Sequence, residues 1–153
     1  MKVQPFIIAG LGLILIGAGF YFRADVNQKS AAIVLEPSFT IRGTEFKAII
    51  SDTPALRKKG LSGRESLGAG QAMVFIFDRP ELVGFWMKDM RFSIDILFLD
   101  DSMRVISFAR NVSPQTFPES FYPDAPARYV VEFVAGTLDR LGVKKGDLTE
   151  IRL

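Results

Sequence analysis

The stretch from Gly84 to Asp100 constrains the fold of this chain more than any other part of the sequence. Phe92, Ile94, Ile96 and Phe98 alternate with Ser93, Asp95, Leu97 and Leu99, and a period of two is typical of a β-strand with one buried face. The only tryptophan, Trp86, and a lysine, Lys88, precede this alternation. Charged side chains within apolar strand sequence are costly to bury unless they are paired or bind a ligand. The stretch therefore predicts a central strand and also the place of a functional site.

The same pattern predicts further short strands along the chain. We expect a hairpin or two short strands at 39–50, and single strands at 72–77, 82–88, 93–99, 103–109, 128–134 and 148–152. Many short strands at close spacing favour a mainly β fold, as a small antiparallel β-sandwich or barrel.

Two minor helices and one long loop interrupt these strands. Thr53, Pro54 and Gly60 are typical of the N-cap, the first position and the C-terminal stop of a short helix at 54–59. One or two helical turns fit at 136–142. The segment 111–127 holds four prolines with interleaved aromatic residues, and long loops of this kind are often functional.

The N-terminal end of the chain differs from the rest. The run from Pro5 to Phe22 is almost wholly apolar and about 18 residues long, at the lower edge of what a transmembrane helix needs. Lys2 and the amino terminus precede the run, whereas Arg23 and Asp25 balance each other after it. This charge distribution favours a cytoplasmic N-terminus, with the rest of the chain in the periplasm or outside the cell.

The N-terminal run can be an uncleaved anchor, a cleaved signal peptide or, less in keeping with its flanks, a buried core helix. Gly17-Ala18-Gly19 offers the small residues of a cleavage site, but Phe20 to Phe22 extend the apolar run beyond it. We expect a signal anchor or signal peptide at 1–23, a linker at 24–37 and a β domain at 38–153, with residues 5–22 in the membrane.

The composition excludes several classes of chemistry. The chain has no cysteine and no histidine, so disulfides, cysteine nucleophiles, histidine-dependent triads and nearly all zinc sites are excluded. Lys2 and Arg23 account for the net charge of +2, and the remainder carries equal numbers of acidic and basic residues. A neutral domain lacks the basic surface of a nucleic-acid-binding protein. We expect a monomer that needs no cofactor and no metal.

Several motifs, taken in order, are similar to those of a known family. They are Arg57-x-x-Gly60-Leu61-x-x-Arg64, Met73-Val-Phe-Ile-Phe77, Phe85-Trp-Met-Lys88 with Asp95-Ile96, Tyr129-Val-Val-Glu132 with Gly136, and Gly146-Asp147. Over residues 38–153 the pattern resembles the family catalogued as domain of unknown function 192, and Phe-Trp-Met-Lys is its most specific part. The resemblance implies a small jelly-roll-like β-sandwich behind a signal or anchor, with no established activity. The chain departs from the family pattern at Asp89-Met90, where the family usually has Asn-Thr.

Trp86 and Lys88 are the first candidate site residues. Positions 86 and 88 share one face if a strand continues through both. A pocket with the indole as its floor and the ammonium group as its polar anchor would then form, since a cation beside an indole is stabilised by the ring. The alternative is a lysine stem packed on the indole with the amine in water.

Asp95 and Glu132 are carboxylates among apolar strand neighbours. They can pair with Lys88, Arg57 or Arg64, as structural or ligand-orienting ion pairs. They can instead be the two carboxylates of a glycosidase-like hydrolase, a chemistry that needs neither histidine nor cysteine.

The sequence thus predicts a membrane-tethered domain outside the cytoplasm that binds a small polar ligand or a cell-envelope polymer, without catalysis. The expected ligand-binding residues are Trp86, Lys88, Asp95, Glu132 and Arg57. The alternatives are a carboxylate-based hydrolase that uses Asp95 and Glu132, and an adaptor that docks another envelope protein through 111–127.

Overall fold

The computed structural model describes residues 36–153. The predicted signal anchor at 1–23, and nearly all of the predicted linker at 24–37, therefore lie outside the described residues. Within the described range, no helix is long and apolar enough to cross a membrane.

Short strands are the main secondary structure of the described residues, with two short helices. The elements are β1 (Ser38–Ile41), β2 (Thr44–Ser51), α1 (Pro54–Lys59), β3 (Gln71–Glu81), β4 (Phe85–Trp86), β5 (Ile94–Leu99), β6 (Val105–Val112), the 3-10 turn η1 (Pro114–Thr116), β7 (Ser120–Phe121), β8 (Ala127–Val134), α2 (Thr137–Leu141) and β9 (Thr149–Arg152). The mainly β fold with two short helices is confirmed. The helix predicted at 54–59 is α1, and the Thr53 hydroxyl accepts a hydrogen bond from the Leu56 amide at 3.2 Å, as an N-cap does.

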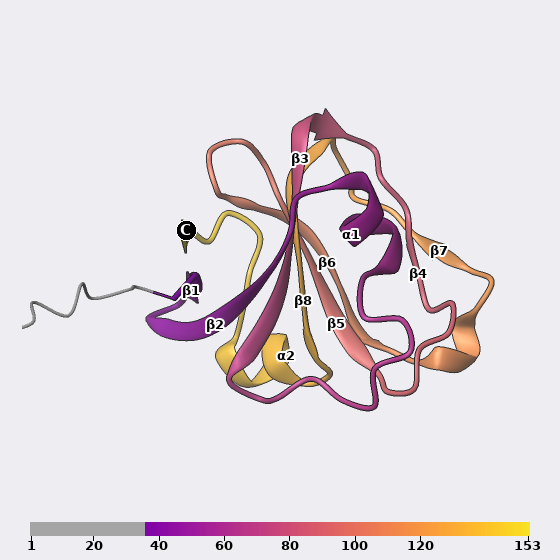
Figure 1. The fold of residues 1–153 in the computed structure, drawn as a ribbon. Helices are drawn as coiled ribbons and strands as arrows, with labels where there is room; N and C mark the ends of the chain where they lie inside the picture. The colour runs from indigo at the N-terminus through magenta and orange to yellow at the C-terminus, as the bar shows by residue number, and fades with distance from the viewer. Residues whose placement is uncertain (1–35) are drawn as a thin grey trace, which may run out of the picture. The chain divides into compact units, whose positions relative to one another are not determined.

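Seven of these strands form one curled sheet in the order β6-β5-β8-β3-β2-β1-β9, and β4 pairs with β7 in a separate ribbon. Most neighbours in the sheet are antiparallel, but β2 and β3 are parallel. This pair is the exception to the predicted antiparallel pairing, because α1 and the loop after it carry the chain back to start β3 beside β2. Figure 1 shows α1 and the β4–β7 ribbon together at one side of the sheet, at the right of the view.

The two edges of the sheet meet at one end. Arg104 and Leu148, just before β6 and β9, form an isolated antiparallel bridge. The Val105 amide donates to the Asp147 carbonyl at 3.0 Å, and the Thr149 amide donates to the Met103 carbonyl at 3.0 Å. These bonds close the curled sheet locally, so that it forms a partly closed barrel.

The central strands are buried on both faces, and β5 is buried along its whole length. The inner core fills the barrel and includes Phe39, Phe46, Val74, Leu97, Phe133 and, from α2, Leu138. The outer core lies on the opposite face of β3, β5 and β8 and includes Leu61, Phe75, Phe77, Met87 and Phe98. The segment after α1 and the segment around β4 cover this outer face, and the candidate site lies there.

Several element predictions are wrong in their bounds: the strand expected at 72–77 extends to Glu81 as β3, and the strand expected at 103–109 is Val105–Val112. The strand expected at 82–88 is reduced to Phe85–Trp86. The backbone of this segment pairs only with β7, over these two residues, whereas its other apolar side chains pack into the outer core without strand pairing. The loop expected at 111–127 begins inside β6, which extends to Val112, and it contains η1 and β7.

Candidate functional site

A pocket of about 300 Å³ lies on the outer face of the sheet, between α1 and the β4 segment. Its walls are mostly apolar, and its charged residues are three cations and one carboxyl group. It is lined by Arg57, Lys58, Lys59, Gly60, Leu61, Ser62, Phe75, Phe77, Val83, Gly84, Phe85, Trp86, Met90 and Glu132. Apolar walls with a few polar groups are the usual composition of a small-molecule site.

The sheet forms the floor of this pocket. Phe75 and Phe77 are two residues apart on β3, so they share its outer face. Glu132 lies on the neighbouring strand β8, opposite Met73 of β3. Phe85 of the ribbon packs edge-on against Phe75, with ring centroids 4.9 Å apart. The ribbon is thereby held over the floor by aromatic contacts.

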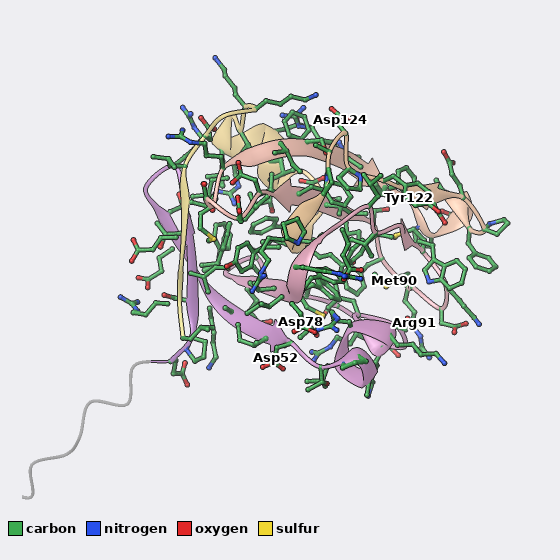
Figure 2. The ribbon with its side chains drawn as sticks, turned by 90° about the horizontal axis from the view of Figure 1, so that it is seen from above. Asp52, Asp78, Met90, Arg91, Tyr122 and Asp124 are labelled. Carbon is green, nitrogen blue, oxygen red and sulfur yellow. The ribbon has the colours of Figure 1, made fainter. Side chains whose placement is uncertain are left out.

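One wall is α1, which is held to the sheet through Arg57. The Arg57 guanidinium donates to the Ile76 carbonyl at 2.8 Å and lies 5.0 Å from the centre of the Phe77 ring. It also donates to the Asp52 carbonyl. Figure 2 shows Asp52 and Asp78 on the same side of the molecule as α1. Arg57 therefore forms part of the wall, and its guanidinium already donates hydrogen bonds to two backbone carbonyls.

The two lysines that follow Arg57 are free to meet a ligand. Lys58 and Lys59 are exposed, and neither forms a salt bridge within residues 36–153. Gly60 then turns the chain with φ of 49°, and a Cβ at this position would lie 3.4 Å from the Phe75 ring. The turn at Gly60 thus brings the basic end of α1 directly over the aromatic floor.

The segment after β4 forms the opposite wall and is tied to the loop that follows α1. The Ser62 hydroxyl donates to the Lys88 carbonyl at 2.9 Å, and the Gly63 amide donates to the Asp89 carbonyl at 2.9 Å. Arg91 and Glu65 add an exposed ion pair. Met90, which lines the pocket, and Arg91 lie beside α1 (Figure 2). The two walls are therefore connected by two hydrogen bonds to backbone carbonyls and by one ion pair.

Glu132 is the unusual group of the site. It is only 6% exposed, and its Oε2 atom has no hydrogen-bond partner. No lysine or arginine of residues 36–153 forms an ion pair with it, so the expected pairing with a cation is not found. Burial raises the pKa of Glu132 to about 8. The pocket therefore contains a carboxyl group that is mainly protonated at neutral pH.

Asp95 has a different role, on the other face of the sheet. Its Oδ2 accepts from the Leu138 amide at 2.8 Å, and its Oδ1 accepts from the Asn111 amide at 2.8 Å. Gly136, the N-cap residue of α2, has no side chain that could accept a hydrogen bond from an amide of the first turn. Asp95 therefore caps α2 from a neighbouring strand and is fully enclosed.

The structure does not bring Asp95 and Glu132 together. In the pairing of β5 with β8, Asp95 is opposite Phe133, whereas Glu132 is opposite Ile96. Since paired residues share a face and successive residues alternate, the two carboxylates point to opposite faces of the sheet.

Of the other predicted site residues, Trp86 and Arg57 line the pocket and Lys88 does not. Trp86 is 55% exposed and meets the Phe117 ring edge-on at 6.0 Å between centroids. The strand ends at Trp86, so Lys88 lies in the following turn, exposed to solvent. Arg64 borders a separate hollow beside β2.

Sequence reasoning did not identify the aromatic floor or the two lysines of α1. Phe75 and Phe77 lie in a continuous apolar run, and such a run does not show which residues face a pocket. The sequence signal that could have identified the lysines is their position directly before Gly60, which places them in the last turn of the predicted helix. Within residues 36–153, no group of three acidic side chains is arranged to hold a metal ion.

One family model and two solved structures match this chain. The profile of the family DUF192, described as an uncharacterized ACR, matches residues 38–151. A crystal structure of a protein of unknown function from Novosphingobium aromaticivorans DSM 12444 is similar, with 30% sequence identity, a TM-score of 0.69, and coverage of 76% of this chain and 84% of that one. A candidate transcription regulator from Sinorhizobium meliloti 1021 is 27% identical with a TM-score of 0.70, over 75% of this chain and 93% of that one. No match was found among curated proteins.

Proposed function

Because the chain belongs to the DUF192 family, whose description names no activity, we propose its function from the pocket itself. The chain is a membrane-tethered binding domain that holds a small ligand in the Glu132 pocket, without catalysis. The membrane tether and the position outside the cytoplasm rest on the apolar run at 5–22 and its flanking charges.

The observation that carries this proposal is the unpartnered Oε2 atom of Glu132. A buried polar atom without a hydrogen bond costs about 1–3 kcal/mol. In most proteins such an atom is paired with the protein or with ordered water. A ligand that hydrogen-bonds this oxygen recovers that free energy, and the aromatic walls add the burial of its apolar surface.

The charges of the pocket favour binding over hydrolysis. Hydrolysis by two carboxylates needs both groups across one cleft. Glu132 is the only acidic residue among those that line the pocket, and Asp95 faces the other side of the sheet. The hydrolase alternative therefore lacks a second carboxylate at this site.

A ligand screen on the full-length chain tests the proposal. Trp86 is the only tryptophan of the chain and lines the pocket, so its fluorescence reports on occupancy. With the protein reconstituted in phosphatidylcholine vesicles, compounds that shift the fluorescence should also raise the melting temperature, because a ligand that binds only the native state stabilises it.

Two matched variants show whether the site is the one proposed. Glu132→Leu should abolish binding or weaken it strongly, whereas Glu150→Leu, at an exposed position on β9, should not affect it. If every compound that binds the wild type binds Glu132→Leu equally well, the proposal is wrong.

A second candidate function is the docking of another envelope protein through 111–127. Two exposed aromatic side chains in this segment favour it, Phe117 at 45% and Tyr122 at 62%. A partner that docks there should lose affinity in the double variant Phe117→Ala, Tyr122→Ala and keep its affinity in Glu132→Leu, whereas Glu132→Leu should abolish or strongly weaken the binding of a small ligand in the pocket.

A further inference from the structure

The charges around the Glu132 pocket are unequally distributed. Glu132 is buried, whereas Lys58 and Lys59 of α1 are exposed. The only other titratable side chain among those that line the pocket is Arg57. The lining residues of β3 and of the 83–90 segment are uncharged, and the residue of β5 opposite Glu132 is Ile96. A ligand in this pocket therefore meets one buried carboxyl group and a cationic mouth.

We infer that the pocket selects amphipathic organic anions, with a hydroxyl or carbonyl group at the Glu132 end and an anionic group at Lys58 and Lys59. The apolar body of the ligand packs between these two ends, against the aromatic floor. The inference rests on the proposed function and names the class of ligand for the same site.

The hydrogen-bonding capacity of Glu132 supports the neutral group at the inner end. A protonated carboxyl group carries one O–H donor and accepting oxygens. A ligand hydroxyl can accept from this donor or donate to the unpartnered oxygen, and a ligand carbonyl can accept from the donor. Either group satisfies the buried carboxyl without placing a second charge beside it.

The cations of α1 argue against a positively charged ligand. An ammonium group at Glu132 would require the carboxyl group to ionise, and burial opposes this by raising its pKa to about 8. Such a ligand would also pass the cationic side chains of α1. An anionic group at the mouth is attracted by the same side chains, and Lys58 and Lys59 have no competing acidic partner within residues 36–153.

Four probes of equal chain length test the inference on the full-length chain in phosphatidylcholine vesicles, by titration of Trp86 fluorescence. They are 8-hydroxyoctanoate, octanoate, 1,8-octanediol and 8-amino-1-octanol. 8-Hydroxyoctanoate should bind most tightly, about tenfold better than octanoate, because octanoate leaves the Glu132 oxygen unpaired. The diol should lack the salt-dependent part of the affinity, because it carries no charge.

Three variants assign these differences to residues. Glu132→Leu should make octanoate and 8-hydroxyoctanoate bind equally, whereas Glu132→Gln, which keeps a donor and an acceptor, should retain the preference for 8-hydroxyoctanoate. The double variant Lys58→Ala, Lys59→Ala should reduce the preference for 8-hydroxyoctanoate over the diol. The matched control Lys144→Ala, Lys145→Ala removes two exposed lysines after α2 and should leave that preference unchanged.

The pH dependence separates the possible outcomes. Affinity for 8-hydroxyoctanoate should fall as the pH rises through about 8, because an ionised Glu132 repels the anion. If 8-amino-1-octanol binds best, with an affinity that rises with pH, the pocket selects cations and the inference is overturned while the proposed function stands. If none of the four probes binds, the inference is also overturned, and the ligand screen above decides separately whether the pocket binds anything.

Discussion

At the scale of single residues, Glu132 couples the stability of the domain to pH. Its pKa is raised from 4.5 to about 8 in the folded state, so between these values the folded protein holds a proton that the unfolded chain releases. Since the folded state binds more protons, stability falls as the pH rises through this window and levels off above it. The favourable contribution of the protonated form is therefore fully present only at low pH.

We expect the free energy of unfolding to fall by about 4 kcal/mol between pH 5 and pH 9 on account of this group. Chemical denaturation of the wild type and of Glu132→Gln at several pH values measures it. The variant cannot ionise at this position and should lose this part of the pH dependence. If the free energy of unfolding changed with pH in the same way in both proteins, Glu132 would titrate as an ordinary exposed carboxyl group.

The sequence predicted which carboxylates are buried but not what they face. Apolar neighbours on both sides made Asp95 and Glu132 strong candidates for burial, and both are buried. Which face each one occupies depends on how β5 pairs with β8, and no local pattern in either strand contains that register. Lys88 was assigned to the face of Trp86 because the strand was expected to continue through both residues. The strand β4 instead ends at Trp86.

At the scale of elements, α2 depends on a residue from another strand. Thr137–Leu141 makes little more than one helical turn and begins after Gly136, which offers no capping side chain. Asp95 supplies the missing acceptor for the Leu138 amide. A short helix is stable mainly through such tertiary contacts, since its own propensity is insufficient.

Asp95→Asn should therefore cost about 3 kcal/mol, because one of the two backbone amides that donate to Asp95 then faces an NH₂ group instead of a carboxylate oxygen. Equilibrium unfolding of full-length protein at neutral pH measures the change. Asp101→Asn, at an exposed turn position, is the control and should remain within about 0.5 kcal/mol of the wild type. An equally small effect at Asp95 would show that α2 does not need this cap.

Elements with strong local signals were predicted well, and those defined by distant partners were not. The bounds of α1 were predicted because Thr53, Pro54 and Gly60 each have a positional preference of their own. The parallel pairing of β2 with β3 was missed because strand sequence shows alternation but not the direction of the neighbouring strand. The pocket depends on this pairing, which places α1 over Phe75 and Phe77.

At the scale of the whole molecule, the turn before β9 controls closure of the barrel. The Asp147 carboxylate accepts from the Lys144 amide at 2.9 Å and from Arg42 at 3.2 Å. The hydrogen bond from the Lys144 backbone, together with Arg42, lowers the pKa of Asp147. With a lowered pKa, the stability that Asp147 contributes is present above its ordinary pKa and is lost as the pH falls through the folded value.

Asp147→Ala should loosen the junction of the two sheet edges. We expect hydrogen exchange at the amides of Val105 and Thr149 to become about tenfold faster, because the turn that presents the Asp147 carbonyl loses a hydrogen bond and an ion pair. Hydrogen exchange followed by mass spectrometry measures this. Asp124→Ala removes an exposed carboxylate that pairs with Lys145, and it should leave both amides unchanged. Equal exchange in the two variants would mean that other contacts hold the edges together.

The burial of β5 on both faces has a consequence for how the chain avoids misfolding. A strand whose residues are all enclosed gains nearly the same apolar contacts if it pairs one residue out of step, so hydrophobicity alone is a weak guide to its correct partner. Asp95 and Glu132 remove this ambiguity. A shift of one residue that inverted β5 would take Asp95 away from the Leu138 amide, and one that inverted β8 would put the Glu132 carboxyl group inside the barrel. An Asp95 carboxylate that is buried without its two amide donors costs about 1–3 kcal/mol or more. The two acidic residues thus disfavour the alternative pairing.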